Sequence, residues 1–160
     1  MLLFSKFMHT MTVCRLWMNW WANGSIKICK VKVKVRCSNI FDEYLGKEEV
    51  RQVELNCLVD TGAVLSYLPQ EVVELLGIPE NGNVIVTYAD ERKDELRKVG
   101  PVKISIGKRH GNFDCLEGPP NCEPIIGQIV LEELDLLIDP KERELVVRPE
   151  SPFLPLLKMK

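Results

Sequence analysis

The sequence predicts a single, mostly β domain with closed or sandwich-like sheets. Strict alternation of apolar and polar residues, which is typical of half-buried strands, recurs along the chain, and glycines and prolines separate the alternating stretches. Only two short stretches have a helical character. The length of 160 residues suits one domain with a sizeable core better than two domains. Hydrophobic residues make up 46% of the chain and charged residues 28%, a composition that excludes a disordered or collagen-like protein.

The first two strands are expected over 29–37 and 53–59. One face of the first strand carries a basic row, which consists of Lys30, Lys32, Lys34 and Arg36. We interpret this row as a solvated strand face whose lysines discourage edge pairing, with a nucleic-acid patch as the alternative. A charged turn over 42–50 separates the two strands, and the second strand ends directly before Asp60.

A short helix is expected over 69–76. Pro69 suits the first helical position, Glu71 favours the positive end of the helix dipole, and Gly77 supplies the stop. The stretch 84–106 then predicts a strand, a charged and solvated hairpin tip at 89–98, and a returning strand.

The last third of the domain contains a second short helix and a final hairpin. A turn bracketed by Gly107 and Gly111 and a proline-containing loop at 117–124 precede them. The short helix is expected after Gly127 and carries Ile129, Val130, Leu131 and Leu134, and the hairpin is expected between 136 and 147. The whole prediction amounts to seven or eight short strands and two short helices.

The chain divides into an N-terminal extension at 1–24, a domain at 25–149 and a Pro-rich, apolar tail at 150–160. The extension holds all three tryptophans and four of the five methionines, and Lys6 and Arg15 interrupt it. We interpret it as an accessory extension or an overlong gene model, because its internal methionines could start translation; the alternative is a peripheral aromatic anchor. No uncharged run in it approaches the roughly 20 residues of a membrane helix, so no membrane partner is expected.

Charge, histidine and cysteine content narrow the chemistry. The net charge is −2, so no global basic field exists to hold nucleic acid. With two histidines, His9 and His110, a multi-histidine metal centre is out of reach, and a Ser–His–Asp apparatus would need one of the two. The six cysteines contain no C-x-x-C pair, which disfavours zinc, and a Cys115–Cys122 disulfide is the alternative to free thiols. We therefore expect a cytoplasmic protein with free cysteines, no metal and no cofactor.

Asp60 is the candidate for a chemically reactive residue. An acid directly after an apolar strand is expected at the strand tip beside the core, where burial raises a carboxyl pKa. Thr61 adds a hydroxyl, and Gly62 allows a close backbone approach. Two carboxylates that share a proton can hydrolyse an amide, because one takes a proton from water while the other donates to the carbonyl. Tyr67 and Tyr88 could line a cleft nearby, although packing is the ordinary role of such residues.

Two segments of the sequence carry a resemblance to a known family. Leu58-Val59-Asp60-Thr61-Gly62-Ala63 after a strand, and Ile125-Ile126-Gly127 before a helix, resemble the retropepsin-like aspartic proteases, the single-lobed relatives of pepsin. The similarity covers roughly residues 26–148, and the sequence looks most like the small cellular members found in prokaryotes.

The resemblance implies a retropepsin-like closed β-barrel lobe in which Asp60 is catalytic. It also implies that six residues form and support the active-site loop: Thr61, Gly62, Ala63, Ile125, Ile126 and Gly127. Thr61 would brace two such loops across an axis, and a flap at about 84–102 would close over the peptide. The charged tip, which lacks a glycine-rich turn, departs from the family pattern.

The chain has one Asp-Thr-Gly, because Asp139 precedes Pro140 and is predicted to lie in a turn. A two-fold homodimer would bring Asp60 against its own image. We therefore predict an aspartic endopeptidase that cleaves peptides or unfolded proteins as a homodimer, with the apolar C-terminal segment or strands near the chain ends at the interface. The alternatives are a non-catalytic dimeric peptide-binding module and an ordinary Asp-Thr-Gly turn.

Overall fold

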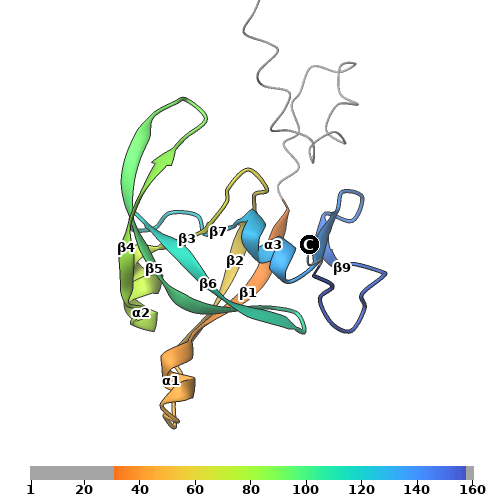
Figure 1. Ribbon diagram of the computed structural model, residues 1–160, viewed down its shortest axis with the longest axis horizontal. Coiled ribbons are helices and arrows are strands. Elements are labelled where there is room, and N and C mark those ends of the chain that lie inside the picture. Colours follow the sequence, from red (N-terminus) through yellow and green to blue (C-terminus); the bar gives the residue numbers. More distant parts are fainter. Residues whose placement is uncertain (1–30, 158–160) are drawn as a thin grey trace, which may run out of the picture.

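The computed structural model describes residues 31–157, which form nine strands and three short helices (Figure 1). The mostly β fold class is confirmed. In chain order the elements are β1 (Lys32–Asn39), α1 (Ile40–Tyr44), β2 (Gln52–Val59), β3 (Ser66–Pro69), α2 (Gln70–Leu76), β4 (Glu80–Thr87), β5 (Lys93–Ile106), β6 (Arg109–Gly118), β7 (Ile125–Ile126), α3 (Gln128–Glu133), β8 (Leu136–Asp139) and β9 (Glu144–Val147).

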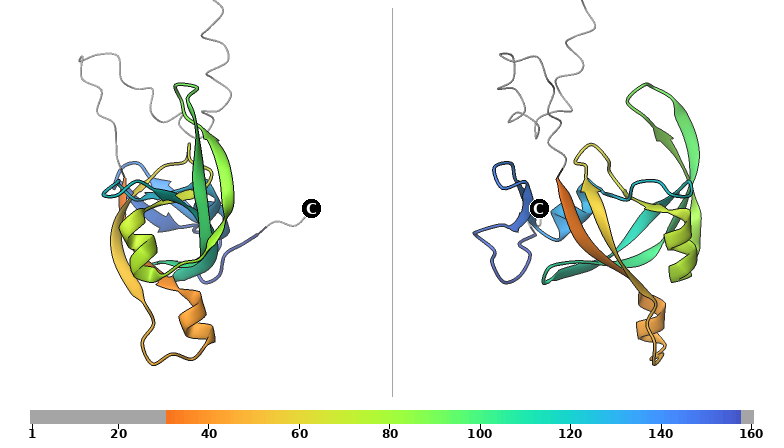
Figure 2. Two further views of the ribbon diagram at one scale, coloured as in Figure 1. Left: turned by 90° about the vertical axis from the view of Figure 1, so that its left-hand side faces the viewer. Right: turned by 180° about the vertical axis from the view of Figure 1, so that it is seen from behind.

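Seven strands form one sheet in the order β1-β2-β7-β3-β6-β5-β4, and β1 also pairs with β5. The last strand in the order, β4, pairs with the outer half of β5, and the two strands form a long hairpin, here called the arm. In both views of Figure 2 the arm (green) rises on the same side of the molecule as the loop after β2 (yellow). The hairpin β8–β9 is a separate two-stranded sheet.

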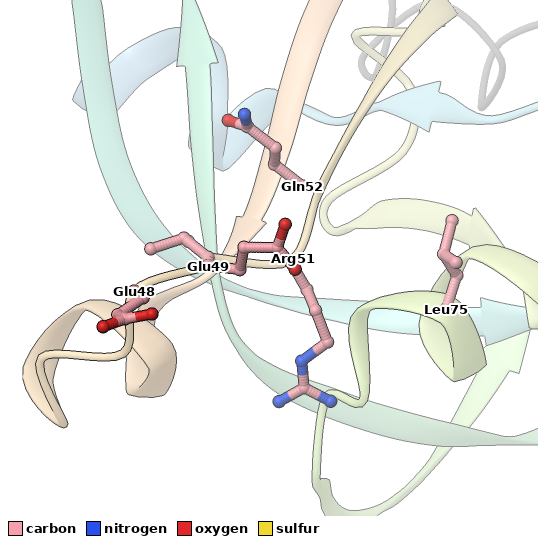
Figure 3. A pocket seen from close by; sticks show the side chains of 6 residues that line it. Glu48, Glu49, Arg51, Gln52 and Leu75 are labelled. Atoms are coloured by element: carbon pink, nitrogen blue, oxygen red, sulfur yellow. The ribbon is translucent and has the colours of Figure 1, made fainter.

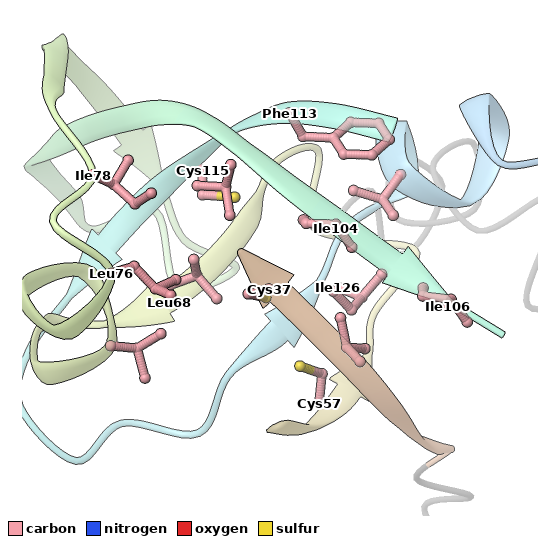
Figure 4. Packing of buried hydrophobic residues seen from close by; sticks show 14 of the residues in the cluster. Cys37, Cys57, Leu68, Leu76, Ile78, Ile104, Ile106, Phe113, Cys115 and Ile126 are labelled. Carbon is pink, nitrogen blue, oxygen red and sulfur yellow. The ribbon is translucent and has the colours of Figure 1, made fainter. Parts of the chain in front are cut away.

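The core lies between the strands and is lined mainly by aliphatic side chains and cysteines (Figure 4). Cys37, Cys57 and Cys115 are fully buried and free, as expected for cysteines that serve as small hydrophobes. Burial raises the pKa of the Cys37 and Cys57 thiols to about 12 and that of Cys115 well above its usual range. Cys122 is also free, so the Cys115–Cys122 disulfide is not formed.

Most elements lie where the alternation predicted them, and the two expected helices are present as α2 and α3. Gly77 ends α2 in a left-handed conformation, with φ 61°. Pro69 is the N-cap of α2 and not its first residue. In the basic row, Lys32 pairs with Glu123 at 2.8 Å, and the row's next two members pair with Glu54. These three cations therefore belong to a solvated strand face with two acids beside it, and Lys30 lies outside the described residues.

The predicted turn over 42–50 is wrong in its first part, because α1 occupies its start. The Asn39 side chain caps this helix by accepting from the backbone N–H of Phe41 at 2.8 Å. Asp42 is fully buried and accepts from the Lys47 ammonium and from the Arg51 Nε, each at 2.7 Å. The charges that suggested a solvated turn therefore include a buried ion cluster that shapes the segment.

The turn bracketed by Gly107 and Gly111 is confirmed at its start, because Gly107 and Lys108 form the turn between β5 and β6. The rest of that turn and the start of the loop at 117–124 are wrong, because β6 already begins at Arg109 and extends to Gly118. Pairing to β5 and to β3 keeps this segment extended despite its glycines. Gly111 has a packing role, since a Cβ there would stand 2.7 Å from the Phe113 ring. The arm tip is likewise shorter than predicted, since β5 already begins at Lys93.

The C-terminal tail is attached to the domain through Asp135. Its carboxylate accepts from the Arg148 Nε at 2.7 Å, from the Leu156 backbone N–H at 3.1 Å and from the Ser151 hydroxyl. The buried Arg109 strengthens this attachment by donating to the Ser151 carbonyl.

The attached tail nevertheless leaves four large apolar side chains exposed: Phe153, Leu154, Leu156 and Leu157. The expected extension at 1–24 lies outside the described residues, and the domain bounds of 25–149 stay a prediction. No helix within 31–157 is long and apolar enough to cross a membrane.

Candidate functional site

Asp60 follows the last residue of β2, at the start of a loop that leads to β3. The short strand β7 lies between β2 and β3, and Leu58 and Val59 pair with Ile125 and Ile126 in a parallel register. The loop therefore has to pass across the end of β7 to reach β3. In this way the fold brings together the two segments that the sequence singled out.

Backbone hydrogen bonds clamp the loop to β7 and to the start of α3. The Asp60 N–H donates to the Ile126 carbonyl at 3.0 Å. At the other end of the Asp-Thr-Gly-Ala segment, the Gln128 N–H donates to the Ala63 carbonyl at 2.7 Å. Both ends of the segment are therefore held by the second of the two segments.

Gly127 is required by the close approach of two backbones. A Cβ at this position would stand 2.6 Å from the Leu65 carbonyl carbon and 2.9 Å from the Ala63 oxygen, and real Cβ atoms essentially never come so close to backbone atoms. The buried Ser66 hydroxyl accepts from the Gly127 N–H at 3.1 Å. Ser66 was missed in the sequence, because no local pattern links it to a glycine 61 positions away. The position of the Asp60 loop therefore depends on a glycine of the second segment.

The Asp60 carboxylate is exposed, although the sequence predicted its burial beside the core. Its Oδ1 accepts a hydrogen bond from the Gly62 N–H at 2.8 Å, which fixes the orientation of the carboxylate. The prediction of burial is wrong for a single chain, because Asp60 lies beyond the last β2–β7 pair, at Val59 and Ile126, where the sheet no longer covers it.

A row of half-buried side chains leads from Asp60 across the sheet. Leu58 is aligned with Ile125, and Ile125 is aligned with Tyr67 of β3. Residues in register share one face of a sheet, and Asp60 has the same parity as Leu58. We call these three aligned residues the floor of the candidate site.

The inner face of the arm continues this surface. Val84 pairs with Leu96, and Val86 pairs with Asp94. All four side chains are half-buried, in contrast to the exposed Ile85 between them. The arm therefore presents one semi-apolar face to the body of the protein. It occupies the place in the chain at which the flap was expected.

Tyr67 belongs to the floor, and Tyr88 is the first residue after β4, at the tip of the arm. Burial raises the pKa of the Tyr67 phenol above its usual value, and the nearby Tyr88 phenol adds to the rise. The sequence made both tyrosines candidates for lining a cleft, and both are half-buried.

Two surface hollows within the described residues lie elsewhere. One is lined by residues 48–52 and Leu75, at the opposite end of β2 from Asp60 (Figure 3). The other lies at the base of the arm, where Arg97 bonds to Glu117 at 2.6 Å. Within residues 31–157, no three His, Cys, Asp or Glu side chains are grouped so that they could hold a metal ion.

Comparison with known proteins gives a match at the level of structure. No family model matches the chain, and no curated protein matches it. Among solved structures, EIAV protease complexed with the inhibitor HBY-793 is 19% identical and aligns over 71% of this chain and 94% of its own, with a TM-score of 0.48. At this level of likeness no residue role transfers from one protein to the other.

Proposed function

We propose that the protein is an aspartic endopeptidase that hydrolyses peptide bonds between the Asp60 carboxylates of a homodimer. The observation that carries the proposal is the presentation of Asp60. Its carboxylate is exposed, oriented by the Gly62 N–H, and set on a loop that β7 and α3 clamp in place. Rigid support of an accessible carboxylate is what general acid–base chemistry requires.

A second copy is needed because one carboxylate cannot act as acid and base at once. A two-fold axis beside Asp60 would place two identical carboxylates together and cover both from water. Like charges about 3 Å apart cannot both ionise, so one carboxyl would hold a proton and the other would stay ionised. The exposure of Asp60 in a single chain agrees with a site that a partner completes.

In the proposed reaction, the ionised carboxylate takes a proton from a water molecule, whose oxygen then attacks the carbonyl carbon of the peptide bond. The protonated carboxyl donates its proton to the carbonyl oxygen as the tetrahedral intermediate forms. The carboxyl that took the proton from water then passes it to the amide nitrogen, while the other carboxylate takes back a proton from a hydroxyl of the diol intermediate. The C–N bond breaks, and the amine and the carboxylic acid are released. The peptide would lie between the floor and the arm, whose apolar side chains exclude water from it.

The exposed tail offers a surface for the second copy. Asp135 and Arg109 hold the segment at Ser151, and Phe153 is 90% exposed while Leu154 is 77% exposed. Large apolar side chains that are held in fixed positions and left in water are typical of a surface that another chain covers. We propose that this segment contributes to the dimer interface.

The test compares cleavage of reduced, carboxymethylated casein by the wild-type protein and by Asp60→Asn, with Asp139→Asn as the matched control. We expect Asp60→Asn to lose at least about 10³-fold in kcat/KM and the control to stay within about twofold. Sedimentation velocity should show a dimer, and activity should fall faster than linearly on dilution. Cleavage by Asp60→Asn at the wild-type rate would end the protease proposal.

The same experiment separates the alternative, a dimeric peptide-binding module. A wild-type dimer that binds the casein probe without cleaving it would favour the module. In that case Asp60→Asn would leave binding within about twofold, because an exposed carboxylate with one internal hydrogen bond contributes little to the fold.

A further inference from the structure

The face of the sheet that carries the floor continues into the arm. Tyr67 of the floor is aligned with Leu116 of β6, and Leu116 is aligned with Lys98 of β5. Alternate residues of a strand share one face, so Leu96 and Asp94 lie on the same face of β5 as Lys98. β5 is one strand of 14 residues whose first part belongs to the arm. The inner face of the arm is therefore an extension of the floor, and Asp94 lies on it.

Asp94 differs in chemistry from its neighbours on the inner face. It is paired with Val86, and the adjacent pair on the same face is Val84 with Leu96. A carboxylate at a half-buried position between aliphatic side chains departs from the apolar pattern of that face. Departures of this kind from a local pattern are expected at functional positions. The Asp94 side chain is 44% exposed, so a bound molecule can reach it.

The charges that neighbour Asp94 on β5 have close partners within the chain. On the outer face, Glu95 accepts from the Asn83 amide at 2.7 Å. On the inner face, the Lys98 ammonium lies 3.2 Å from the Asp114 carboxylate. Asp94, by contrast, accepts no hydrogen bond from any residue in the described part of the chain. Its carboxylate therefore keeps its capacity to accept.

The ion pair that Asp94 does make is weak. Its Oδ2 lies 3.9 Å from the Nε of Arg92, whose side chain is 63% exposed. The Arg92 guanidinium also lies 4.5 Å from the centroid of the Tyr88 ring, which is a cation–π distance. An exposed ion pair at such a separation contributes little, because water screens the charges. A cation that donates directly to the Asp94 carboxylate would bind it more strongly than Arg92 does.

A peptide between the floor and the arm would bring its side chains to this carboxylate. The arm rises on the same side of the molecule as the loop that carries Asp60 (Figure 2). Burial is the main cause of the raised pKa of the Tyr67 phenol, and the charge of Asp94 adds to it, which agrees with an inner face directed at the floor. Lysine and arginine have an apolar stem that can pack on Val86 and Leu96 while the cationic end reaches Asp94.

We propose that Asp94 is a specificity-determining residue, which selects peptides with a lysine or arginine side chain near the bond to be cleaved. This inference rests on the proposed function, because it concerns the peptide that Asp60 would hydrolyse. It deepens that function by naming the class of substrate. Asp94 contacts the peptide away from the reacting atoms, so it acts on binding and not on proton transfer.

The first experiment profiles cleavage of a random peptide library by mass spectrometry of the products. We expect the wild type to favour lysine and arginine about tenfold at one position near the cleaved bond, since a hydrogen-bonded charge contributes at least that much. Asp94→Asn should remove this preference, and Asp94→Lys should favour aspartate and glutamate there. Glu95→Gln, on the outer face, is the matched control and should keep the wild-type profile. The same profile in the wild type and in Asp94→Asn would overturn the proposal.

The second experiment compares two peptides that differ only in this side chain, lysine in one and norleucine in the other. For the wild type, KM should be about tenfold lower with lysine, and kcat should agree within about twofold. The difference in KM should shrink as the salt concentration rises. Asp94→Asn should cleave both peptides as the wild type cleaves the norleucine peptide. An equal loss on both peptides would show that Asp94 only supports the arm, and would refute selection.

The third experiment separates this proposal from the proposed function by measuring binding without cleavage. Asp60→Asn protein is used to capture peptides from the same library, with and without Asp94→Asn. If the wild type cleaves nothing, but Asp60→Asn captures lysine and arginine peptides only while Asp94 is present, the proposed function fails and selection stands. If cleavage depends on Asp60 and shows no preference for basic side chains, the proposed function stands and selection is refuted. Neither cleavage nor capture would refute both.

Discussion

Asp60 and Asp42 are two aspartates of the same β domain, and their surroundings are opposite. Asp42 is fully buried and accepts from the Lys47 and Arg51 side chains and from the Arg51 N–H, which holds its carboxyl pKa well below the usual range. Asp60 is exposed, and within the described residues its side chain accepts one hydrogen bond, from Gly62. An acid that serves the fold has its oxygens saturated by the chain itself, whereas Asp60 keeps acceptor capacity for water, substrate or a second copy.

The largest expected effect is on activity, at Asp60. Asp60→Asn should remove at least about 10³-fold of kcat/KM, while the melting temperature changes by less than about 2 °C. The reason is that the side chain contributes one exposed hydrogen bond to the fold. Casein cleavage measures the predicted loss of activity, and differential scanning calorimetry on the same preparation measures the melting temperature. A large loss of stability would mean that Asp60 is a structural acid.

The converse effect is expected at Asp42. Asp42→Asn should lower the melting temperature by roughly 5–10 °C, because it removes the charge that two cations share and leaves a buried amide among donors. At temperatures where the variant is folded, its kcat/KM should stay within about threefold, since α1 lies at the opposite end of β2 from Asp60. Glu48→Gln, on the exposed part of the same segment, is the control and should leave stability unchanged.

Replacing two glycines of the site should also have different effects, one on stability and the other on activity. Gly127→Ala would place a Cβ 2.6 Å from the Leu65 backbone and should destabilise the protein by about 1–3 kcal/mol. Gly62→Ala would place a Cβ 3.1 Å from the Asp60 Oδ1, so it should cost activity, about tenfold, with little change in stability. Urea denaturation and initial rates measure the two effects. Equal stability losses would show that both glycines serve only the fold.

Alternation along the chain predicted β1, β2 and the returning strand β5, because the burial of one strand face leaves a period of two in the sequence. It did not predict β3 and β7, the strands beside the Asp60 loop, because segments of four and two residues are too short to show that period. The Asp60 loop and the Ile125–Gly127 segment could also be identified from the sequence alone. Their contact through β7 agrees with that identification. The roles of these residues stay a proposal.

The elements that could not be predicted depend on distant partners. β6 contains Gly111 and ends at Gly118, which locally favour turns, and it is a strand because β5 and β3 pair with it on both sides. The exposure of Asp60 could not be deduced either, since it depends on where the β2–β7 pairing stops.

The smallest expected effect concerns the attachment of the tail at low pH. Bonds from Ser151, Arg148 and the Leu156 N–H hold the Asp135 pKa at about 2, below the ordinary value of about 3.9 in the unfolded chain. A carboxyl with a lowered pKa stabilises the fold above its unfolded pKa, and this contribution is lost as the pH falls toward the folded pKa. The melting temperature of the wild type should therefore decline between about pH 4 and pH 2.

Asp135→Asn isolates this contribution. Asparagine tolerates the positive φ of 52° at this position, so the backbone can keep its conformation. The variant should be less stable than the wild type at pH 7, and the difference should shrink as the pH falls from about 4 to about 2, because protonation removes the same charge from the wild type. If the tail also contributes to a dimer interface, the dimer of Asp135→Asn should dissociate at higher protein concentration. A difference in melting temperature between the variant and the wild type that stays constant from pH 4 to pH 2 would show that the Asp135 charge does not hold the tail.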